Sequence, residues 1–265
     1  MSSIVITGLR TYPIKSLGGF ESDWVQVEKR GFQYDRRWLL VDENNVFLTQ
    51  RSDTRMALYR TECSSNGLVV SNPNKERMVI PYVPEGDRRM VQIWSSHCDA
   101  VQVNATVDEW FSDFLGIRCS LVFMPDDSVR PTSPSFSKPD DMVSFADGYP
   151  VMIAGESSLE DLNGRLEVPL PMNRFRPNII VSGSAPFEED IWKSCKTGEV
   201  ELRSTKLCGR CSVTATNQET GEVGIEPLKT LASYRLRDQS INFGAYFVPD
   251  RLGQIRVGET LATSE

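Results

Sequence analysis

Short runs of β-branched and aromatic residues, separated by turn residues, recur along most of this chain. Such runs are too short for long helices, and their side chains suit the pleated surface of a sheet. This pattern therefore predicts a mostly β fold. The predicted strands are Ile4–Thr7, Trp24–Val27, Trp38–Val41, Gly67–Ser71, Met78–Ile80, Val91–Trp94, Val101–Val103, Ser120–Phe123, Asn178–Ser182, Val200–Arg203, Ser212–Thr216, Ala245–Val248 and Gln254–Val257.

Two segments show helical spacing instead. The first, "NATVDEWFSDFLG", repeats large apolar residues every three or four positions, and Gly116 supplies a stop. In the second, "ESSLEDLNGRL", Ser158 and Asp161 resemble a capping box. Leu159, Leu162 and Leu166 form the apolar face of this second helix. We therefore expect an α+β chain that is predominantly β.

A segment from about Met124 to Met142 contains four prolines and many serines. It suits neither a ladder nor a long helix, because proline lacks the N–H that both need. We interpret it both as a connection between two units and as a loop that shapes an access route. The predicted division is an N-terminal β-rich domain over residues 1–124 and a second β domain over residues 125–265, with 125–142 as the connecting loop.

The composition limits the class of protein. The 265 residues carry a net charge of -7, which argues against general binding of nucleic-acid polymers. Neither a signal peptide nor a stretch able to span a membrane is evident, so we expect a cytoplasmic protein without a membrane partner. The six cysteines are scattered, and we expect reduced thiols.

Cys208 and Cys211 form a C-x-x-C motif between two predicted strands. A structural zinc site needs four ligands, and only Cys195 stands nearby. The single histidine, His97, cannot supply several imidazoles, and no G-x-S-x-G elbow accompanies it. A thioredoxin-like motif would open a helix, whereas a strand leads out here. From spacing alone, two buried structural thiols remain an open alternative.

Basic residues stand at the ends of several predicted strands. Taken singly, each suits a solvated surface, but together they suit a cradle for an anion, because Arg and Lys bind phosphate oxygens. The helix start at Ser157 and Ser158 would add free N–H groups. Cations also favour the thiolate form of a cysteine, which is a ligand for soft metals. The basic residues concerned are Lys15, Arg36, Arg37, Arg174, Arg176 and Arg210.

Several motifs together resemble those of one known family. They are "YPIKSLGG", "GFQYDRRWLLVD", "SFADGYPVMIAGESSLEDLNGRL", "RFRPNIIVSG", "EEDIW", "CGRC" and "FGAYFV…GQIRVGE", in this order. The order and content resemble the MOSC proteins that carry an N-terminal MOSC β-barrel domain, and among them the amidoxime-reducing components and the bacterial reductases of N-hydroxylated bases. The resemblance covers nearly the whole chain.

This resemblance implies a C-terminal MOSC β-barrel and a molybdenum cofactor, a molybdopterin held between the two halves of the chain. By motif position, Cys211 matches the cysteine that ligates molybdenum and serves catalysis. Cys208 would pack nearby without ligating the metal. The residues that match cofactor contacts are Lys15, Ser16, Arg36, Asp147, Gly148, Ser158, Arg176, Asn178, Arg210 and Tyr246.

The resemblance also implies an activity: two-electron reduction of small N-hydroxylated substrates from N–OH to N–H, with release of water. Some relatives carry an iron–sulfur domain after the barrel, whereas this sequence ends at Glu265. We therefore expect no iron–sulfur cluster in this chain and a separate electron donor of ferredoxin, flavoprotein or cytochrome type. Gly209 stands where close relatives have serine, which removes one hydroxyl contact.

Two alternatives remain beside the reductase. In the first, Cys211 transiently holds a persulfide or the cofactor, and the protein is a carrier. In the second, the chain is a binding module without chemistry, and both thiols are structural. The reductase hypothesis predicts that Lys15 and Arg36 approach Cys211 in space.

Overall fold

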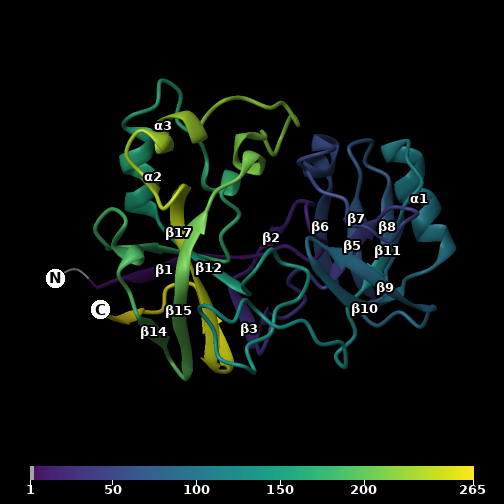
Figure 1. The fold of residues 1–265 in the computed structure, drawn as a ribbon, viewed down its shortest axis with the longest axis horizontal. Helices are drawn as coiled ribbons and strands as arrows, with labels where there is room; N and C mark the ends of the chain where they lie inside the picture. The colour runs from purple at the N-terminus through teal and green to yellow at the C-terminus, as the bar shows by residue number, and fades with distance from the viewer. Residues whose placement is uncertain (1–2) are drawn as a thin grey trace.

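The computed structural model describes residues 3–265, and it is built mainly from β-strands (Figure 1). Within that range the α-helices are α1 (Ala105–Leu115), α2 (Glu156–Asn163) and α3 (Leu228–Ala232). The predicted α+β class with a β majority is confirmed. No helix in the described part combines the length and the apolar character that crossing a membrane requires.

The first lobe, on the left of Figure 1, contains a nine-stranded sheet. Its strand order is β19-β14-β15-β17-β12-β13-β1-β2, and β16 pairs with β17. A small sheet, β18-β3-β4, shares one apolar core with it. The bounds are β1 Val5–Thr11, β2 Phe20–Glu21, β3 Trp24–Glu28, β4 Gly31–Phe32, β12 Val151–Gly155, β13 Ile179–Ser182, β14 Ser194–Thr197, β15 Val200–Gly209, β16 Leu236–Arg237, β17 Ser240–Arg251, β18 Gly253–Arg256 and β19 Ala262–Ser264.

The second lobe, on the right of Figure 1, contains two smaller sheets and α1. One sheet has the order β5-β11-β10-β9 and the other β6-β7-β8. As predicted, α1 ends at Gly116, which has φ of 66°, and Asn104 caps its start by accepting a hydrogen bond from the N–H of Val107. The bounds are β5 Trp38–Val41, β6 Arg60–Ser64, β7 Gly67–Ser71, β8 Arg77–Ile80, β9 Arg88–Ile93, β10 Ser96–Gln102 and β11 Ser120–Phe123.

The lobes do not follow the order of the chain. β1 lies inside the nine-stranded sheet, between β13 and β2, and β18 pairs with β3. The chain then enters the second lobe, where Ile14 forms a bridge with Trp38. The first strands therefore belong to the lobe formed mainly by the C-terminal half, and a domain division near residue 124 stays a prediction.

Several strands have the bounds that the sequence predicts, but one predicted strand is wrong. Trp38–Val41, Gly67–Ser71 and Ser120–Phe123 are strands with the predicted bounds. The proposed strand Ser212–Thr216 is instead a short 3₁₀ helix, Ser212–Ala215. The cause is local, because both the N–H and the hydroxyl of Thr214 donate to the carbonyl of Cys211 and close a turn.

Candidate functional site

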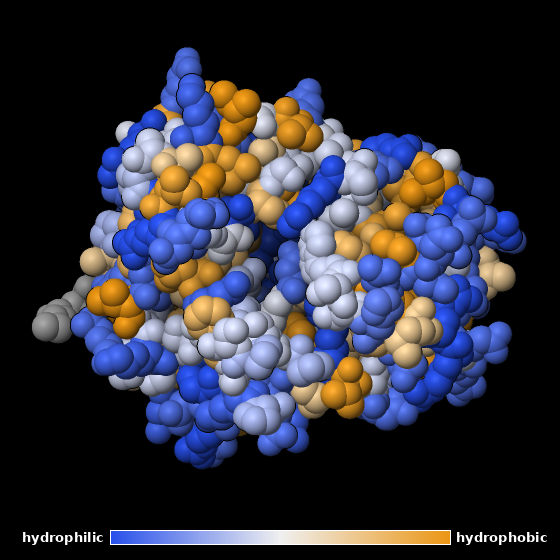
Figure 2. All heavy atoms as spheres, in the orientation of Figure 1, coloured by the Kyte–Doolittle hydropathy of each residue, from blue (hydrophilic) through white to orange (hydrophobic). Residues whose placement is uncertain are grey.

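A cavity of about 100 Å³ lies between the two lobes and opens into a groove of about 820 Å³. Figure 2 shows the hollow near the middle of the molecule, where the lobes meet. Asp147, Cys211 and Tyr246 line both spaces, so cavity and groove are continuous. The predicted site residues that line the cavity are Lys15, Ser16, Arg36, Asp147, Arg176, Asn178, Arg210, Cys211 and Tyr246.

Cys211 reaches the cavity because the chain leaves a strand just before it. β15 ends at Gly209, and Arg210 still pairs with β17 through its N–H, which donates to the carbonyl of Ile241 at 2.7 Å. Cys211 has an extended backbone and precedes the 3₁₀ helix Ser212–Ala215. Its half-buried side chain therefore lines the cavity between a strand end and a fixed turn.

Cys208 occupies a different environment from Cys211. It is 1% exposed, and the Nη1 of Arg210 donates to its sulfur at 2.7 Å. Burial raises the pKa of the Cys208 thiol, although Arg210 acts in the opposite direction. Both cysteines are free thiols, as are the other four. Of the C-x-x-C pair, only Cys211 is open to a ligand in the cavity.

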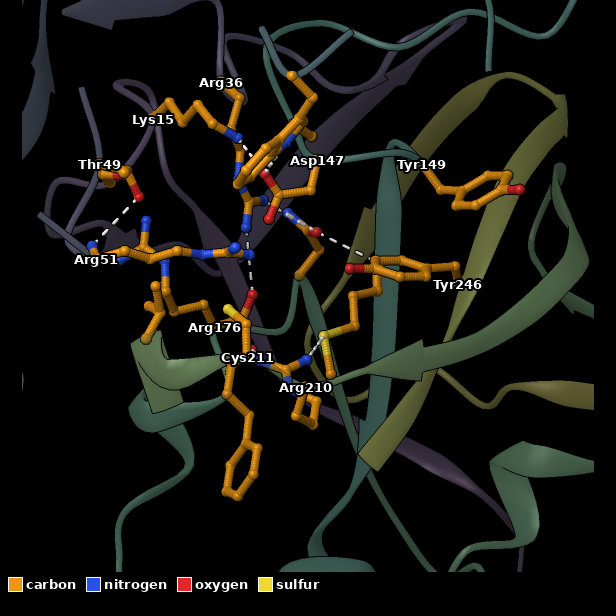
Figure 3. A pocket seen from close by; sticks show the side chains of 17 residues that line it. Lys15, Arg36, Thr49, Arg51, Asp147, Tyr149, Arg176, Arg210, Cys211 and Tyr246 are labelled. Atoms are coloured by element: carbon orange, nitrogen blue, oxygen red, sulfur yellow. Dashed lines mark hydrogen bonds and ion pairs between the residues drawn. The ribbon is translucent and has the colours of Figure 1, made fainter. Parts of the chain in front are cut away.

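Lys15 and Arg36 approach Cys211, as the reductase hypothesis predicts, and all three line one cavity. In Figure 3, Lys15 and Arg36 enter the cavity from the side opposite to Cys211 and Arg210. Residues distant in sequence are thus brought together where the lobes meet.

The backbone is strained around this cavity. Four of its non-glycine residues have positive φ, a conformation that costs about 1 kcal/mol or more for a residue with a side chain. Such strain persists only where the surrounding structure enforces it, and it is concentrated at functional sites. The angles are 69° at Ser16, 49° at Arg36, 54° at Trp94 and 55° at Arg176.

Arg36 is held in place by two buried partners. Its Nη1 donates to Oδ2 of Asp35 at 2.6 Å and to Oδ1 of Asn178 at 3.2 Å. Asn178 also accepts from the N–H of Met152 and donates to the carbonyl of Arg10. The Asn178 amide is thereby used in contacts within the protein. These contacts help to position Arg36.

Asp147 joins the two sides of the cavity. Its carboxylate accepts hydrogen bonds from Nζ of Lys15 and, at 3.2 Å, from Nε1 of Trp94. Burial favours the neutral acid, but the ion pair with Lys15 and these hydrogen bonds outweigh it and hold the pKa of Asp147 well below its usual range. Asp147 is therefore a carboxylate at neutral pH.

Arg176 carries a charge that is not ion-paired with a carboxylate in the described residues, although Asp35 and Asp147 raise its pKa from a distance. Its guanidinium lies 4.2 Å from the centre of the Tyr12 ring, while that of Arg36 lies 4.4 Å from the same ring. Across residues 3–265 the Arg176 guanidinium forms neither an ion pair nor a hydrogen bond. Burial, together with repulsion from Arg36, lowers its pKa to about 10. A bound anion would supply the missing partner.

The groups in this cavity favour one kind of ligand. Five basic side chains line it against the single carboxylate of Asp147, although the whole chain is acidic. In the described residues, no group of three or more His, Cys, Asp and Glu side chains is placed to hold a metal ion. A metal beside Cys211 would thus need ligands from a molecule bound with it. An anionic cofactor that carries its own metal fits these residues.

Ser158 does not line the cavity. This residue is 0% exposed and lies inside α2, whose cap is Gly155, so the predicted capping box is wrong. The Ser158 hydroxyl donates to the carboxylate of Glu189 at 2.9 Å, and Glu189 also accepts from the N–H of Gly155. The protein's own carboxylate therefore occupies this helix start, for which the sequence predicts an anion.

Gly148 lies beside the cavity, in the wall of the groove. The cavity is also lined by four residues that the sequence does not predict: Thr49, Arg51, Trp94 and Tyr149. Arg51 and Trp94 come from loops without a recognisable motif. Only the packing of the lobes brings them to the site, so a pattern in one sequence gives no signal for them.

Two family models match the chain: "MOSC domain" over residues 140–262 and "MOSC N-terminal beta barrel domain" over residues 3–118. The mitochondrial amidoxime-reducing component 1 of Mus musculus is 32% identical over 96% of this chain and 80% of its own length. The mitochondrial amidoxime reducing component 2 of Bos taurus is 30% identical over 96% of this chain and 81% of its own. The solved YuaD protein of Bacillus subtilis is 10% identical with a TM-score of 0.43, over 98% of this chain and 94% of its own.

Proposed function

This chain belongs to the family of MOSC-domain proteins with an N-terminal MOSC β-barrel domain, and from that premise we propose that it reduces N-hydroxylated compounds with a molybdenum cofactor bound between its lobes. The names of its relatives describe the reduction of amidoximes. The reaction consumes two electrons and two protons, breaks the N–O bond, and yields N–H and water.

The observation that carries this proposal is one cysteine thiol that faces the same cavity as five basic side chains, among them Arg176, which forms no ion pair within residues 3–265. Cys211 would ligate the metal, and Lys15, Arg36 and Arg176 would hold the negative charge of the cofactor. When bound, such a cofactor supplies a redox-active, Lewis-acidic metal. Arg176 supports the assignment most strongly, because it is a half-buried cation that forms no ion pair within residues 3–265.

The chain's own residues prepare the site. Asp147 fixes Lys15 and Trp94, so the wall of the cavity stays in one arrangement. Burial raises the pKa of Tyr246 well above its usual value, so its phenol keeps its proton and can donate a hydrogen bond to a bound oxygen.

The test compares wild type with Cys211→Ala, and the control is Cys63→Ala, which changes an exposed cysteine of the second lobe. We expect wild type and the control to contain molybdenum and pterin and to reduce benzamidoxime with a chemical electron donor. Cys211→Ala should fold but lose this activity. A folded wild type from molybdenum-replete cells that lacks molybdenum and carries a persulfide on Cys211 would instead support the carrier hypothesis.

A further inference from the structure

The groove outside the cavity has one wall built from a lysine and two aromatic rings. Lys206, on β15, has its Nζ 5.8 Å from the centre of the Phe136 ring and 5.7 Å from that of Tyr149. These distances are within the range of a cation–π contact. Cys211 follows five residues after Lys206 and lines the same groove. This wall therefore stands next to the proposed reaction centre.

A second wall repeats this chemistry from the other lobe. The guanidinium of Arg51 lies 4.5 Å from the centre of the Trp94 ring. Trp94 is fixed by its hydrogen bond to Asp147 and by an edge contact with Phe47, whose ring centre is 4.6 Å away. The groove is thus lined from both lobes by a cation beside an aromatic ring.

The loop that carries Phe136 is tied at its base to the nine-stranded sheet. Nη2 of Arg203 on β15 contacts Oδ2 of Asp141 at 2.7 Å, and Nζ of Lys138 contacts Oδ1 of Asp250 on β17 at 3.0 Å. These ion pairs fix both the loop and Phe136 relative to Lys206. The proline-rich segment, expected to shape an access route, supplies part of the groove wall.

The cations of the two walls are not ion-paired in residues 3–265, although the charge of Arg51 helps to lower the pKa of Asp147. Within the described part of the chain, neither the ammonium of Lys206 nor the guanidinium of Arg51 forms an ion pair or a hydrogen bond. Asp147 and Asp238 line the groove, and Asp147 is already paired with Lys15. The aromatic rings offer surface to a flat ligand, and the free cations offer charge to an anionic one.

We propose that this groove is the substrate subsite and that it selects flat, aromatic N-hydroxylated compounds bearing a carboxylate or phosphate, with Lys206 and Arg51 as the specificity-determining residues. This inference rests on the proposed reductase function. A neutral substrate of the same shape would use the rings alone, and a cationic substrate would be repelled.

The test uses three benzamidoximes that differ only at the para position: carboxylate, carboxamide and trimethylammonium. We expect kcat/KM to fall in that order for the holoenzyme. In Lys206→Met the value for the carboxylate should fall about two- to fivefold, as for one partly exposed ion pair, with the carboxamide nearly unchanged. Lys196→Met, which changes an exposed lysine on β14, is the matched control and should keep the wild-type order.

Calorimetric titration of the same three compounds separates this inference from the proposed function. Tighter binding of the carboxylate that weakens in Lys206→Met supports the subsite even if no compound is reduced, an outcome that would refute only the reductase. Equal affinity and equal kcat/KM for all three charges would overturn the subsite while leaving the reductase intact.

Discussion

Lys15 and Asp147 form an ion pair at the cavity between the lobes, although 132 residues separate them in the sequence. Lys15 follows β1, and Asp147 follows the proline-rich loop. Burial lowers the pKa of Lys15, while Asp147 opposes this effect. The pair therefore ties together two distant parts of the chain.

Replacing Asp147 with asparagine should destabilise the protein in a pH-dependent way. A carboxyl group whose pKa is lower in the folded than in the unfolded state stabilises the fold above about pH 4 and loses this contribution as the pH falls. Since Asp147 is half exposed, we expect a loss of about 1 kcal/mol at pH 7.

Thermal unfolding of wild type and Asp147→Asn between pH 7 and pH 3 checks this prediction. The difference in Tm should shrink as the solution becomes acidic. Asp127→Asn, which breaks an exposed pair with Arg88, should change Tm little at any pH. A difference between wild type and Asp147→Asn that grows on acidification would contradict the argument.

Replacing Arg176 with methionine should separate stability from cofactor retention. A cation whose pKa is lower in the folded protein destabilises the fold at neutral pH. We expect the cofactor-free variant to unfold at a Tm equal to or above that of wild type, while its molybdenum and pterin contents fall. Denaturation of the apoprotein and metal analysis of the purified protein measure the two effects. A lower Tm with full cofactor content would contradict the assignment of Arg176 as a cofactor-binding residue.

Replacing Ser158 with alanine should lower the stability of the protein and leave its cofactor content unchanged, the opposite of the Arg176 variant. Loss of the hydroxyl leaves the buried Glu189 carboxylate and the N–H of Phe187 short of a partner, at a cost of about 1–3 kcal/mol. Cofactor content per folded molecule should be unchanged, because Ser158 does not line the cavity. Chemical denaturation and pterin fluorescence test this, and a variant of normal stability that lacks pterin would restore the role expected from the sequence.

The sequence predicts best where local chemistry decides the structure. Gly116 ends α1 as predicted, because a left-handed glycine acts on the residues next to it. The predicted capping box at Ser158 is wrong, because a serine near a helix start resembles a cap in the sequence. The actual partner of the Ser158 hydroxyl is Glu189, which is 31 residues away. Such a contact arises only from tertiary packing.

The candidate site shows the same contrast between features set by local chemistry and features set by tertiary packing. The C-x-x-C spacing does not distinguish Cys208 from Cys211. The end of β15 at Gly209 does, because it falls between the two cysteines. Positive φ at Ser16 and Arg36 is not encoded by their residue types, which disfavour it. Arg51 and Trp94 could not be found, since their neighbour across the site, Asp147, is distant in the sequence.

The position of β1 has a consequence for truncated forms of the protein. Because it is flanked on both sides in the nine-stranded sheet, its removal by a downstream translation start or a proteolytic cut would expose the edge of β13 to aggregation. Fragments cut near residue 124 would each be left with an incomplete hydrophobic interior. Deletion mapping of this protein would therefore report on misfolding rather than on separable activities.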